Sequence, residues 1–464
     1  MLEDHLSQYV KQYGFPGYTE LRAQQNTLRR ANLLNGNLVA NESNRTGGFS
    51  ARVVQKGSYG FASSTDYSAD MGGLHRVVQA AATNANFLDS RLKRGRKDFE
   101  PVKPFTRKDG LEEDLPISPA SLIAYISELE AYIVERYPKL LSRGVMLNCL
   151  DMEKLLYTSD GVVSHSFTPR SILKVSLTAQ DKDGSPVDLY QTYGGYGNFN
   201  HVFDDPQDYF AAVDALYEEV MHKAEGVWPE PGEQQVILHP DLAGILAHEA
   251  VGHTVEADFV QSGSVGGPNL NKRVASDLVT MIDYAHHIGD ALAPVPVFVD
   301  DEGMPGQDVT LIENGILKAF MHNKETAENM EHAPMGNARA FAFSDEPLIR
   351  MRNTGILPGT SKLEEMIASV KNGYYFIKSG NGQADSTGEF MFSVNAGYQI
   401  KDGKLAQPIK ETTISGVAFE VLKTVEMVSD DNEWTCSGMC GKKQPIPVGM
   451  GGPAMKVRIN VGGR

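Results

Sequence analysis

The stretch Pro240–Asp258 constrains the fold of this 464-residue chain more than any other part. It reads PDLAGILAHEAVGHTVEAD, and a proline at the first helical position followed by spaced aliphatic residues predicts a short helix with one apolar stripe. His248, Glu249 and His253 form an H-E-x-x-x-H array on this helix. Two neutral imidazoles can bind a divalent metal, and a carboxylate beside them can act as general base on a bound water. The stretch therefore predicts a metal site.

The spacing of the two histidines restricts the geometry of that site. His248 and His253 are five positions apart, whereas the familiar H-E-x-x-H array places its histidines four apart. At about 100° per residue, a regular α-helix would point the two rings roughly 140° apart, too far to share one ion. A wider π-type turn, or a helix that ends near Gly252, would bring them together. We therefore expect a distorted helix, and a regular helix through His253 would contradict a metal site.

The composition limits the possible partners and the location of the protein. A net charge of −16 argues against nucleic acids and anionic membranes, since phosphate groups are bound by clustered lysine and arginine. No apolar stretch is long enough to span a bilayer, and the acidic N-terminus does not resemble a signal peptide. The odd set of Cys149, Cys436 and Cys440 fits reduced thiols. We expect a cytoplasmic protein without a nucleic-acid or membrane partner.

The break in pattern at Trp228–Gly232, which contains two prolines and a glycine, predicts the main domain boundary. We expect an N-terminal α+β domain at residues 1–228, with a sub-boundary near 90–117, and a β-rich C-terminal domain at 229–464. The predicted metal-binding helix belongs to the second domain. The fold class is therefore α+β, with an N-terminal region of mixed strands and helices followed by a β-rich region.

The N-terminal region is predicted to contain two strand-and-helix units. Residues 1–35 are interpreted as polar helical segments, followed by a β-hairpin around Lys56-Gly57, a helix through 74–81 and a connector at 89–115. A helix should begin at Ser118-Pro119, with the serine as N-cap. Strands are expected at 145–150, 154–159 and 171–180, and a further helix from 205 to about 224.

The C-terminal region is predicted to be an incomplete barrel or a sandwich of short strands. Candidate strands lie at 235–238, 295–299, 307–312, 373–377, 389–400 and 409–414, and one helix lies at about 361–371.

A catalytic zinc site needs a third protein ligand and one open position. Several residues have suitable donor atoms, and the sequence alone does not choose between them. They are Cys436, Cys440, Glu256, Asp258, His286 and His287. Cys440 lies in a glycine-rich segment, where it could approach a metal without crowding.

Three motifs resemble those of one known family. RVVQKGSYGFASS lies near the N-terminus, HEAVGH lies in the centre, and MCGKKQPIPVGMGGP lies near the C-terminus. With these three motifs in this order, the chain resembles the TldD/PmbA proteins, which were once described as modulators of DNA gyrase and are understood as metallopeptidases. The intact histidine array makes it similar to the TldD type. This resemblance implies that His248, His253 and Cys440 bind Zn²⁺ and that Glu249 is the general base, with Cys436 outside the metal site.

The resemblance also implies a substrate and a partner. The family is expected to hydrolyse small or unfolded peptides that bind in extended form along a sheet edge, which reads backbone rather than side chains. It implies a dimer, either a homodimer or a heterodimer with a TldE/PmbA-type subunit. The alternative hypothesis is a non-catalytic, metal-containing binding or regulatory protein of the gyrase-modulator type. A further hypothesis is an amidase that acts on non-peptide substrates, which would have the same metal ligands.

Overall fold

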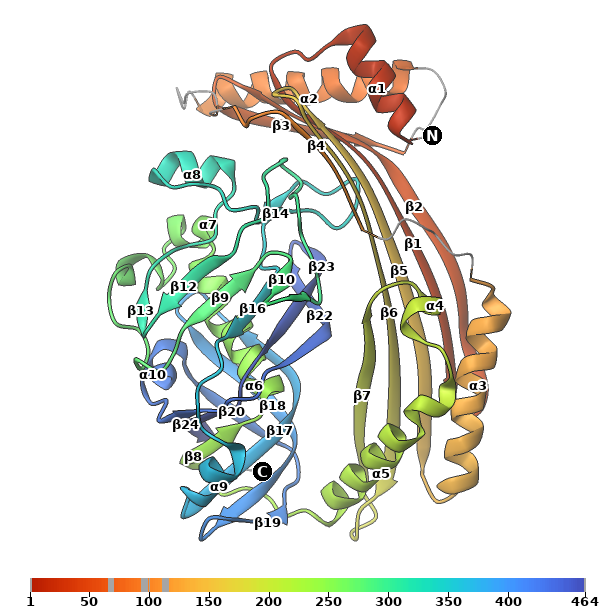
Figure 1. Ribbon diagram of the computed structural model, residues 1–464, viewed down its shortest axis with the longest axis vertical. Coiled ribbons are helices and arrows are strands. Elements are labelled where there is room, and N and C mark those ends of the chain that lie inside the picture. The colour runs from red at the N-terminus through yellow and green to blue at the C-terminus, as the bar shows by residue number, and fades with distance from the viewer. Residues whose placement is uncertain (1, 66–70, 93–98, 100, 111–116, 463–464) are drawn as a thin grey trace.

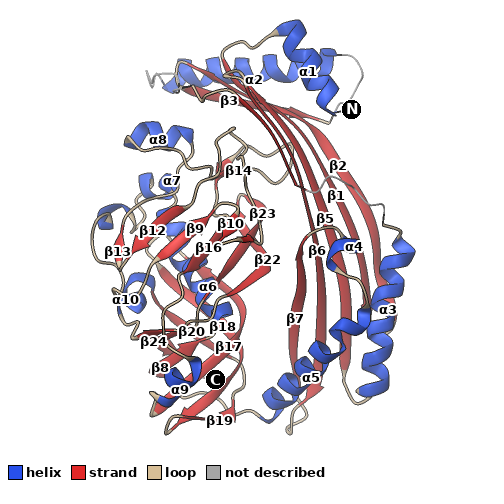
Figure 2. Cartoon of the chain, viewed as in Figure 1, coloured by secondary structure: helices blue, strands red, loops and turns tan. Residues whose placement is uncertain are grey.

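A long, curved sheet runs along one side of the molecule, and a β-rich region that carries the predicted metal-binding helix lies beside it (Figure 1). The computed structural model describes residues 2–65, 71–92, 99, 101–110 and 117–462. Strands dominate both parts, and the longer helices lie on the outside of the curved sheet and at its end (Figure 2). The protein therefore has the expected mixed α+β fold with a β-rich C-terminal region. None of the described helices is long and apolar enough to cross a membrane.

The curved sheet has seven strands in the order β3-β2-β1-β5-β6, and the outer edge of β6 pairs first with β4 and then with β7. All neighbours are antiparallel except β4 and β6, which are parallel. The strands are β1 (Tyr18–Leu34), β2 (Asn37–Gln55), β3 (Ser58–Ser64), β4 (Phe105–Gly110), β5 (Ser142–Thr158), β6 (Val162–Gln180) and β7 (Pro186–Tyr196).

The prediction of helical segments throughout residues 1–35 is wrong for its second half. Helix α1 (Leu2–Tyr13) is present, but the rest of this stretch forms β1. Its buried residues alternate: Leu21 and Ala23 pack into an apolar core, whereas Arg22 and Gln24 face the C-terminal region and donate to its backbone carbonyls. The polar face of β1 is thus a buried contact surface. Because these residues are polar, the sequence of β1 lacks the apolar pattern from which a strand would be predicted.

Two groups of helices cover the two ends of this sheet. Helices α1 and α2 (Met71–Leu92) pack against β1, β2 and β3, and α3 (Pro119–Arg136) and α5 (Phe210–Glu225) pack against the other end. The two predicted strand-and-helix units are therefore present but share one sheet, because β1 pairs with β5 from Glu20↔Thr158 to Leu34↔Gly144. The short α4 (Phe199–Val202) precedes α5.

The hairpin turn and the helix cap that local motifs predict in this region are present. The β2–β3 hairpin turns at Lys56 and Gly57, both with positive φ, and Ser118 caps α3 by accepting a hydrogen bond from Ser121 N. The predicted connector at 89–115 is wrong in part, since it contains the end of α2 and strand β4; residues 93–98, 100 and 111–116 lie outside the described residues.

The C-terminal region contains a small closed barrel. Its five strands pair in the ring β17-β8-β24-β20-β18, and β18 closes the ring by pairing with β17. The barrel is therefore complete rather than incomplete. The strands are β8 (Gly232–Leu238), β17 (Asn372–Ala384), β18 (Glu389–Lys401), β20 (Thr412–Val417) and β24 (Met455–Val461), and β19 (Lys404–Pro408) and β21 (Met427–Val428) pair with its rim.

A second sheet lies next to the barrel, in the order β13-β12-β9-β16-β23-β22. Its strands are β9 (Met281–Tyr284), β12 (Val309–Glu313), β13 (Ile316–Leu317), β16 (Asn353–Ile356), β22 (Glu433–Lys442) and β23 (Gln444–Gly452). Two short pairs, β10 (His287–Ile288) with β11 (Ala291–Leu292) and β14 (Ala338–Arg339) with β15 (Leu348–Ile349), complete the strands. The predicted strand at 295–299 is wrong, because this segment is irregular.

The predicted metal-binding helix begins as α6 (Pro240–Ile245), which packs between the barrel and the second sheet, against β17 and β23. This position places the residues that follow α6 in the largest apolar core of the molecule. The remaining helices are α7 (Ala257–Gln261), α8 (Lys324–Met330), α9 (Leu363–Ala368) and α10 (Ala418–Lys423), with α9 inside the helix predicted at 361–371.

Candidate metal centre and active site

The helix that carries the histidine array is distorted as its spacing requires. After α6 the chain forms a π-helical turn at Leu246–Val251 and then a 3₁₀ turn at Gly252–Val255. The π turn advances the chain by more residues per turn than an α-helix, so residues five apart can share a face. The rings of His248 and His253 accordingly lie with their centroids 5.5 Å apart.

Gly252 lies where the π turn meets the 3₁₀ turn and allows Met351 to pack closely against this point. A Cβ atom at this position would lie 2.0 Å from Sδ of Met351, a fully buried side chain. Residue 252 must therefore be glycine, or Met351 must move, for the chain to pass this point.

Cys440 of β22 completes a three-residue cluster with the two histidines. One potential ligand atom from each of His248, His253 and Cys440 lies within 4.8 Å of the other two, and Cys440 Sγ is 3.3 Å from His253 Nε2. Among the described residues no other group of three His, Cys, Asp or Glu side chains gathers in this way.

The donor atoms of this cluster fit a metal ion. His248 is fully buried, yet neither of its ring nitrogens has a hydrogen-bond partner among the residues that the structure describes. A buried polar atom left without a partner costs free energy, so a ligand at this position would satisfy it. Two imidazoles and one thiolate form a donor set that zinc prefers and that leaves a position for water.

The electrostatics of the cluster favour a thiolate. Burial alone would raise the pKa of Cys440, but its contacts with His248 and His253 outweigh burial and lower that pKa to about 5. The thiolate is the form that binds metals, so Cys440 is ready to act as a ligand at neutral pH.

Glu249 lies beside the cluster and remains ionised. Its Oε2 is 3.4 Å from His253 Nε2, and its side chain is 30 % exposed. Burial would raise its pKa, but the hydrogen bond with His253 and the charges of His248 and Arg350 hold the pKa below its ordinary value. An ionised, partly exposed carboxylate at this place can accept a proton.

Glu256, one of the candidate third ligands, instead supports His253 from the opposite side. Its Oε2 is 3.2 Å from His253 Nδ1 and 3.0 Å from Lys442 Nζ, and its side chain is fully buried. A carboxylate on the second ring nitrogen fixes the orientation of a ligating histidine, as in many metal sites. The signal was present in the sequence as the H-x-x-E spacing of residues 253 and 256.

Arg350 is a second residue of the site that no sequence motif predicts. It is fully buried and donates hydrogen bonds to the backbone carbonyls of Cys440 and Gln444. These bonds hold the end of the β22–β23 hairpin, and so the position of Cys440. No local motif marks this contact, because it joins segments 90 residues apart.

The other candidate ligands lie elsewhere. Cys436 Sγ donates to Gly194 O at 2.9 Å, and Asp258 pairs with Lys442 at 2.7 Å. His286 and His287 contact each other, with Nδ1 atoms 2.7 Å apart, outside the cluster.

A cleft of about 530 Å³ opens in front of Glu249. Its walls come from β7 of the curved sheet, from β17 and from β22, and its floor comes from α6 and Glu249. Glu249 therefore connects the cleft with the three-residue cluster. Among the described strands, β7 pairs with β6 alone and β22 pairs with β23 alone, so neither outer edge is paired with a further strand; Cys436 of β22 donates to one carbonyl of β7, that of Gly194.

Comparison with known proteins defines the class of protein that this fold and site represent. Residues 231–463 match the family model described as the PmbA/TldA metallopeptidase C-terminal domain, and residues 19–85 match domain 1 of the same family. The protein is a metallopeptidase. It belongs to the PmbA/TldD family.

Two relatives illustrate the match in sequence. A metalloprotease from Methanocaldococcus jannaschii is 30 % identical over 454 residues, which cover 96 % of both chains. A zinc metalloprotease TldD homolog from Saccharolobus solfataricus is 37 % identical over 299 residues, which cover 63 % of this chain and 65 % of the relative.

Solved structures share the whole fold. A candidate modulator of a DNA gyrase from Thermotoga maritima superimposes with a TM-score of 0.79 at 18 % identity, covering 99 % of this chain and 100 % of that one. TldE from Thermococcus kodakarensis gives a TM-score of 0.76 at 16 % identity, with both chains covered completely. At these identities the likeness concerns the fold alone.

Proposed function

We propose that this protein is a zinc-dependent peptidase of the TldD type, in which His248, His253 and Cys440 hold Zn²⁺ and Glu249 is the general base. The observation that carries the proposal is the cluster itself: three donor atoms within 4.8 Å, with two nitrogens of a buried histidine left without partners. The name of the Saccharolobus relative, a zinc metalloprotease, supports the choice of metal.

The chemistry is divided between the metal and the protein. When bound, zinc would lower the pKa of a water molecule and polarise the peptide carbonyl. Glu249 accepts the proton of the attacking water and then donates it to the departing amine. Glu256 keeps His253 oriented, and Lys442, which contacts Glu256, balances its buried negative charge.

The cleft suits a small or unfolded peptide in extended form. The outer edges of β7 and β22 offer backbone N–H and C=O groups on opposite walls, to which an extended chain can pair. Such pairing recognises backbone rather than side chains, and so it tolerates many sequences. We further propose that the protein acts as a dimer, either with a second copy of itself or with a TldE/PmbA-type subunit, in line with the TldE structure that shares its fold.

The first test is the metal content of the purified protein. Wild type, His248→Ala and Cys440→Ser are compared by elemental analysis, with Cys436→Ser as the matched control because Cys436 lies outside the cluster. We expect about one zinc per chain in wild type and in Cys436→Ser, and loss of zinc in the other two.

Peptidase assays then separate the two functional hypotheses. Hydrolysis of unstructured peptides, abolished by Glu249→Gln, supports the enzyme. Full metal content without hydrolysis, alone and with a TldE-type subunit, would favour the binding or regulatory protein. A wild-type protein that binds no metal after zinc is added back would overturn the proposal altogether.

A further inference from the structure

A second cavity, of about 80 Å³, lies between the curved sheet and the C-terminal region. It sits at the break in the sheet edge, where β4 ends opposite Phe167 and β7 ends opposite Arg170. On β6 the cavity is lined by alternate residues that share one face of the strand: Ser164, Ser166, Thr168 and Arg170. Pro294–Asp301 and Ile446-Pro447 form the opposite wall.

Arg170 is a buried cation without an ion-pair partner among the described residues. Only 8 % of the residue is exposed, and its Nε has no hydrogen-bond partner. Across the residues that the structure describes, no carboxylate pairs with its guanidinium. Burying an unpaired charge is costly, and an arginine is normally buried with a carboxylate or another anion.

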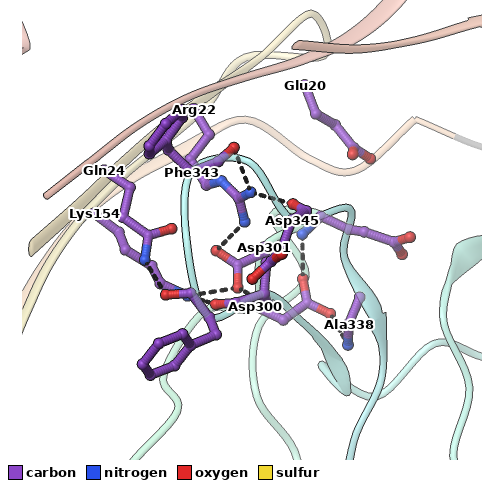
Figure 3. Close-up of polar contacts among 12 residues, drawn as sticks. Glu20, Arg22, Gln24, Lys154, Asp300, Asp301, Ala338, Phe343 and Asp345 are labelled. Atoms are coloured by element: carbon purple, nitrogen blue, oxygen red, sulfur yellow. Dashed lines mark hydrogen bonds and ion pairs between the residues drawn. The ribbon is translucent and has the colours of Figure 1, made fainter. Parts of the chain in front are cut away.

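The carboxylates in the cavity wall are already engaged. Asp109 binds Arg107 through both oxygens. Asp301 accepts from Lys154 and lies 3.3 Å from Arg22, and these three side chains converge in Figure 3. Asp300 accepts from three backbone N–H groups.

The remaining cation in the wall lacks a carboxylate as well. Arg339 donates to the backbone carbonyls of Met351 and Pro447. Among the described residues of the wall, Arg170 and Arg339 are therefore cations that form no ion pair with a carboxylate.

The cavity adjoins the proposed peptide cleft. Arg170 is in register with Tyr196 of β7, two residues beyond Gly194, which lines the cleft. Cys436 of β22 also lines the cleft; burial raises its pKa, and the charge of Arg170 offsets part of this rise. On the other side, Ile446 is in register with Cys440, one of the proposed ligands. A peptide that extends along β7 would reach Arg170 at the end of this strand.

We propose that Arg170 and the hydroxyl groups of Ser164 and Ser166 on β6 form a subsite for a carboxylate of the peptide substrate, either its C-terminus or an acidic side chain. The subsite is a specificity determinant, and this inference rests on the proposed peptidase function. The volume suits one carboxylate-bearing group rather than a nucleotide or a second peptide chain, and the planar guanidinium matches a carboxylate through two parallel hydrogen bonds.

The test uses one short unstructured peptide in four forms. It has a free or amidated C-terminus, and it contains either one Glu or the isosteric Gln. Binding is measured by calorimetry with zinc-loaded Glu249→Gln protein, and kcat/KM is measured with the Glu249 protein. Both proteins are made in three versions: with Arg170 unchanged, with Arg170→Met and with Arg170→Lys. Arg136→Met, which removes an exposed arginine from α3, is the charge-matched control.

We expect one carboxylate-bearing form to bind about 10- to 100-fold more tightly than its neutral counterpart. Arg170→Met should abolish this preference without weakening the neutral peptide, Arg170→Lys should retain part of it, and Arg136→Met should leave it unchanged. The preferred form identifies the C-terminus or the side chain as the source. Arg170→Met should also unfold at the same or a higher temperature, because it removes an uncompensated buried charge.

Equal binding of acidic and neutral forms by wild type would overturn the inference, as would an equal loss for all four peptides in Arg170→Met. Binding of acetate or phosphate without a preference among the peptides would also overturn it. If wild type neither binds nor cleaves any of the four peptides, the proposed function itself fails.

Discussion

At the scale of single residues, Glu249 and Glu256 flank the same histidine but should have separable roles. Glu249 lines the cleft, whereas Glu256 is fully buried behind His253. Glu249→Gln keeps the size of the side chain and removes the base. We expect kcat to fall by about 10²- to 10⁴-fold while the zinc content stays at the wild-type level. Activity that survives this change, measured on metal-loaded protein, would contradict the assignment of the base.

Glu256→Gln should show the opposite pattern. It removes the carboxylate that orients His253 through Nδ1, so zinc affinity should fall by about 10- to 100-fold. Competition with a chromogenic chelator measures this change. Asp258→Asn is the matched control, since Asp258 also contacts Lys442 but does not touch the histidine. A similar loss in both variants would mean that the charge on Lys442, and not the orientation of His253, is what matters.

At the scale of elements, the position of the metal centre depends on how closely α6 approaches β23. A Cβ atom on Gly244 would lie 2.7 Å from the backbone nitrogen of Gly451. Gly244→Ala must push the helix away from the strand, so we expect a loss of about 1–3 kcal/mol in the free energy of unfolding and a lower zinc affinity. Chemical denaturation measures the change in the free energy of unfolding. Gly441→Ala is the control, because a Cβ atom there meets nothing within 4 Å. Equal stability of the two variants would refute the close contact.

The same elements show which features the sequence can predict. The five-residue spacing of His248 and His253 predicted a π-type turn or an early helix end, and the structure has a π turn followed by a 3₁₀ turn at Gly252. This spacing predicts the distortion because the two histidines lie in the same helical segment. Arg350, which holds Cys440 through backbone carbonyls, left no local signal. β1 was mistaken for helix because its polar face is buried against a segment some 320 residues away.

At the scale of the whole molecule, buried ion pairs join the curved sheet to the C-terminal region. Asp301 takes part in two of them, with Arg22 of β1 and Lys154 of β5, and all three side chains are at most 18 % exposed. Asp301→Asn would leave two buried cations without a carboxylate. We expect the free energy of unfolding to fall by about 3–5 kcal/mol. Asp430→Asn, which breaks the exposed pair with Lys362, should cost at most about 1 kcal/mol.

The same pairs make the contact sensitive to acid. Burial would raise the pKa of Asp301, but Lys154 and Arg22 outweigh burial and lower it below its ordinary value. An acid whose pKa is lower in the folded state stabilises the fold above its unfolded pKa of about 4, and this contribution is lost as the pH falls through the folded value. Wild type should therefore lose stability more steeply than Asp301→Asn between about pH 4 and pH 2, as urea unfolding at a series of pH values would show. Parallel curves for the two proteins would mean that Asp301 makes no ionic contribution to the contact between the curved sheet and the C-terminal region.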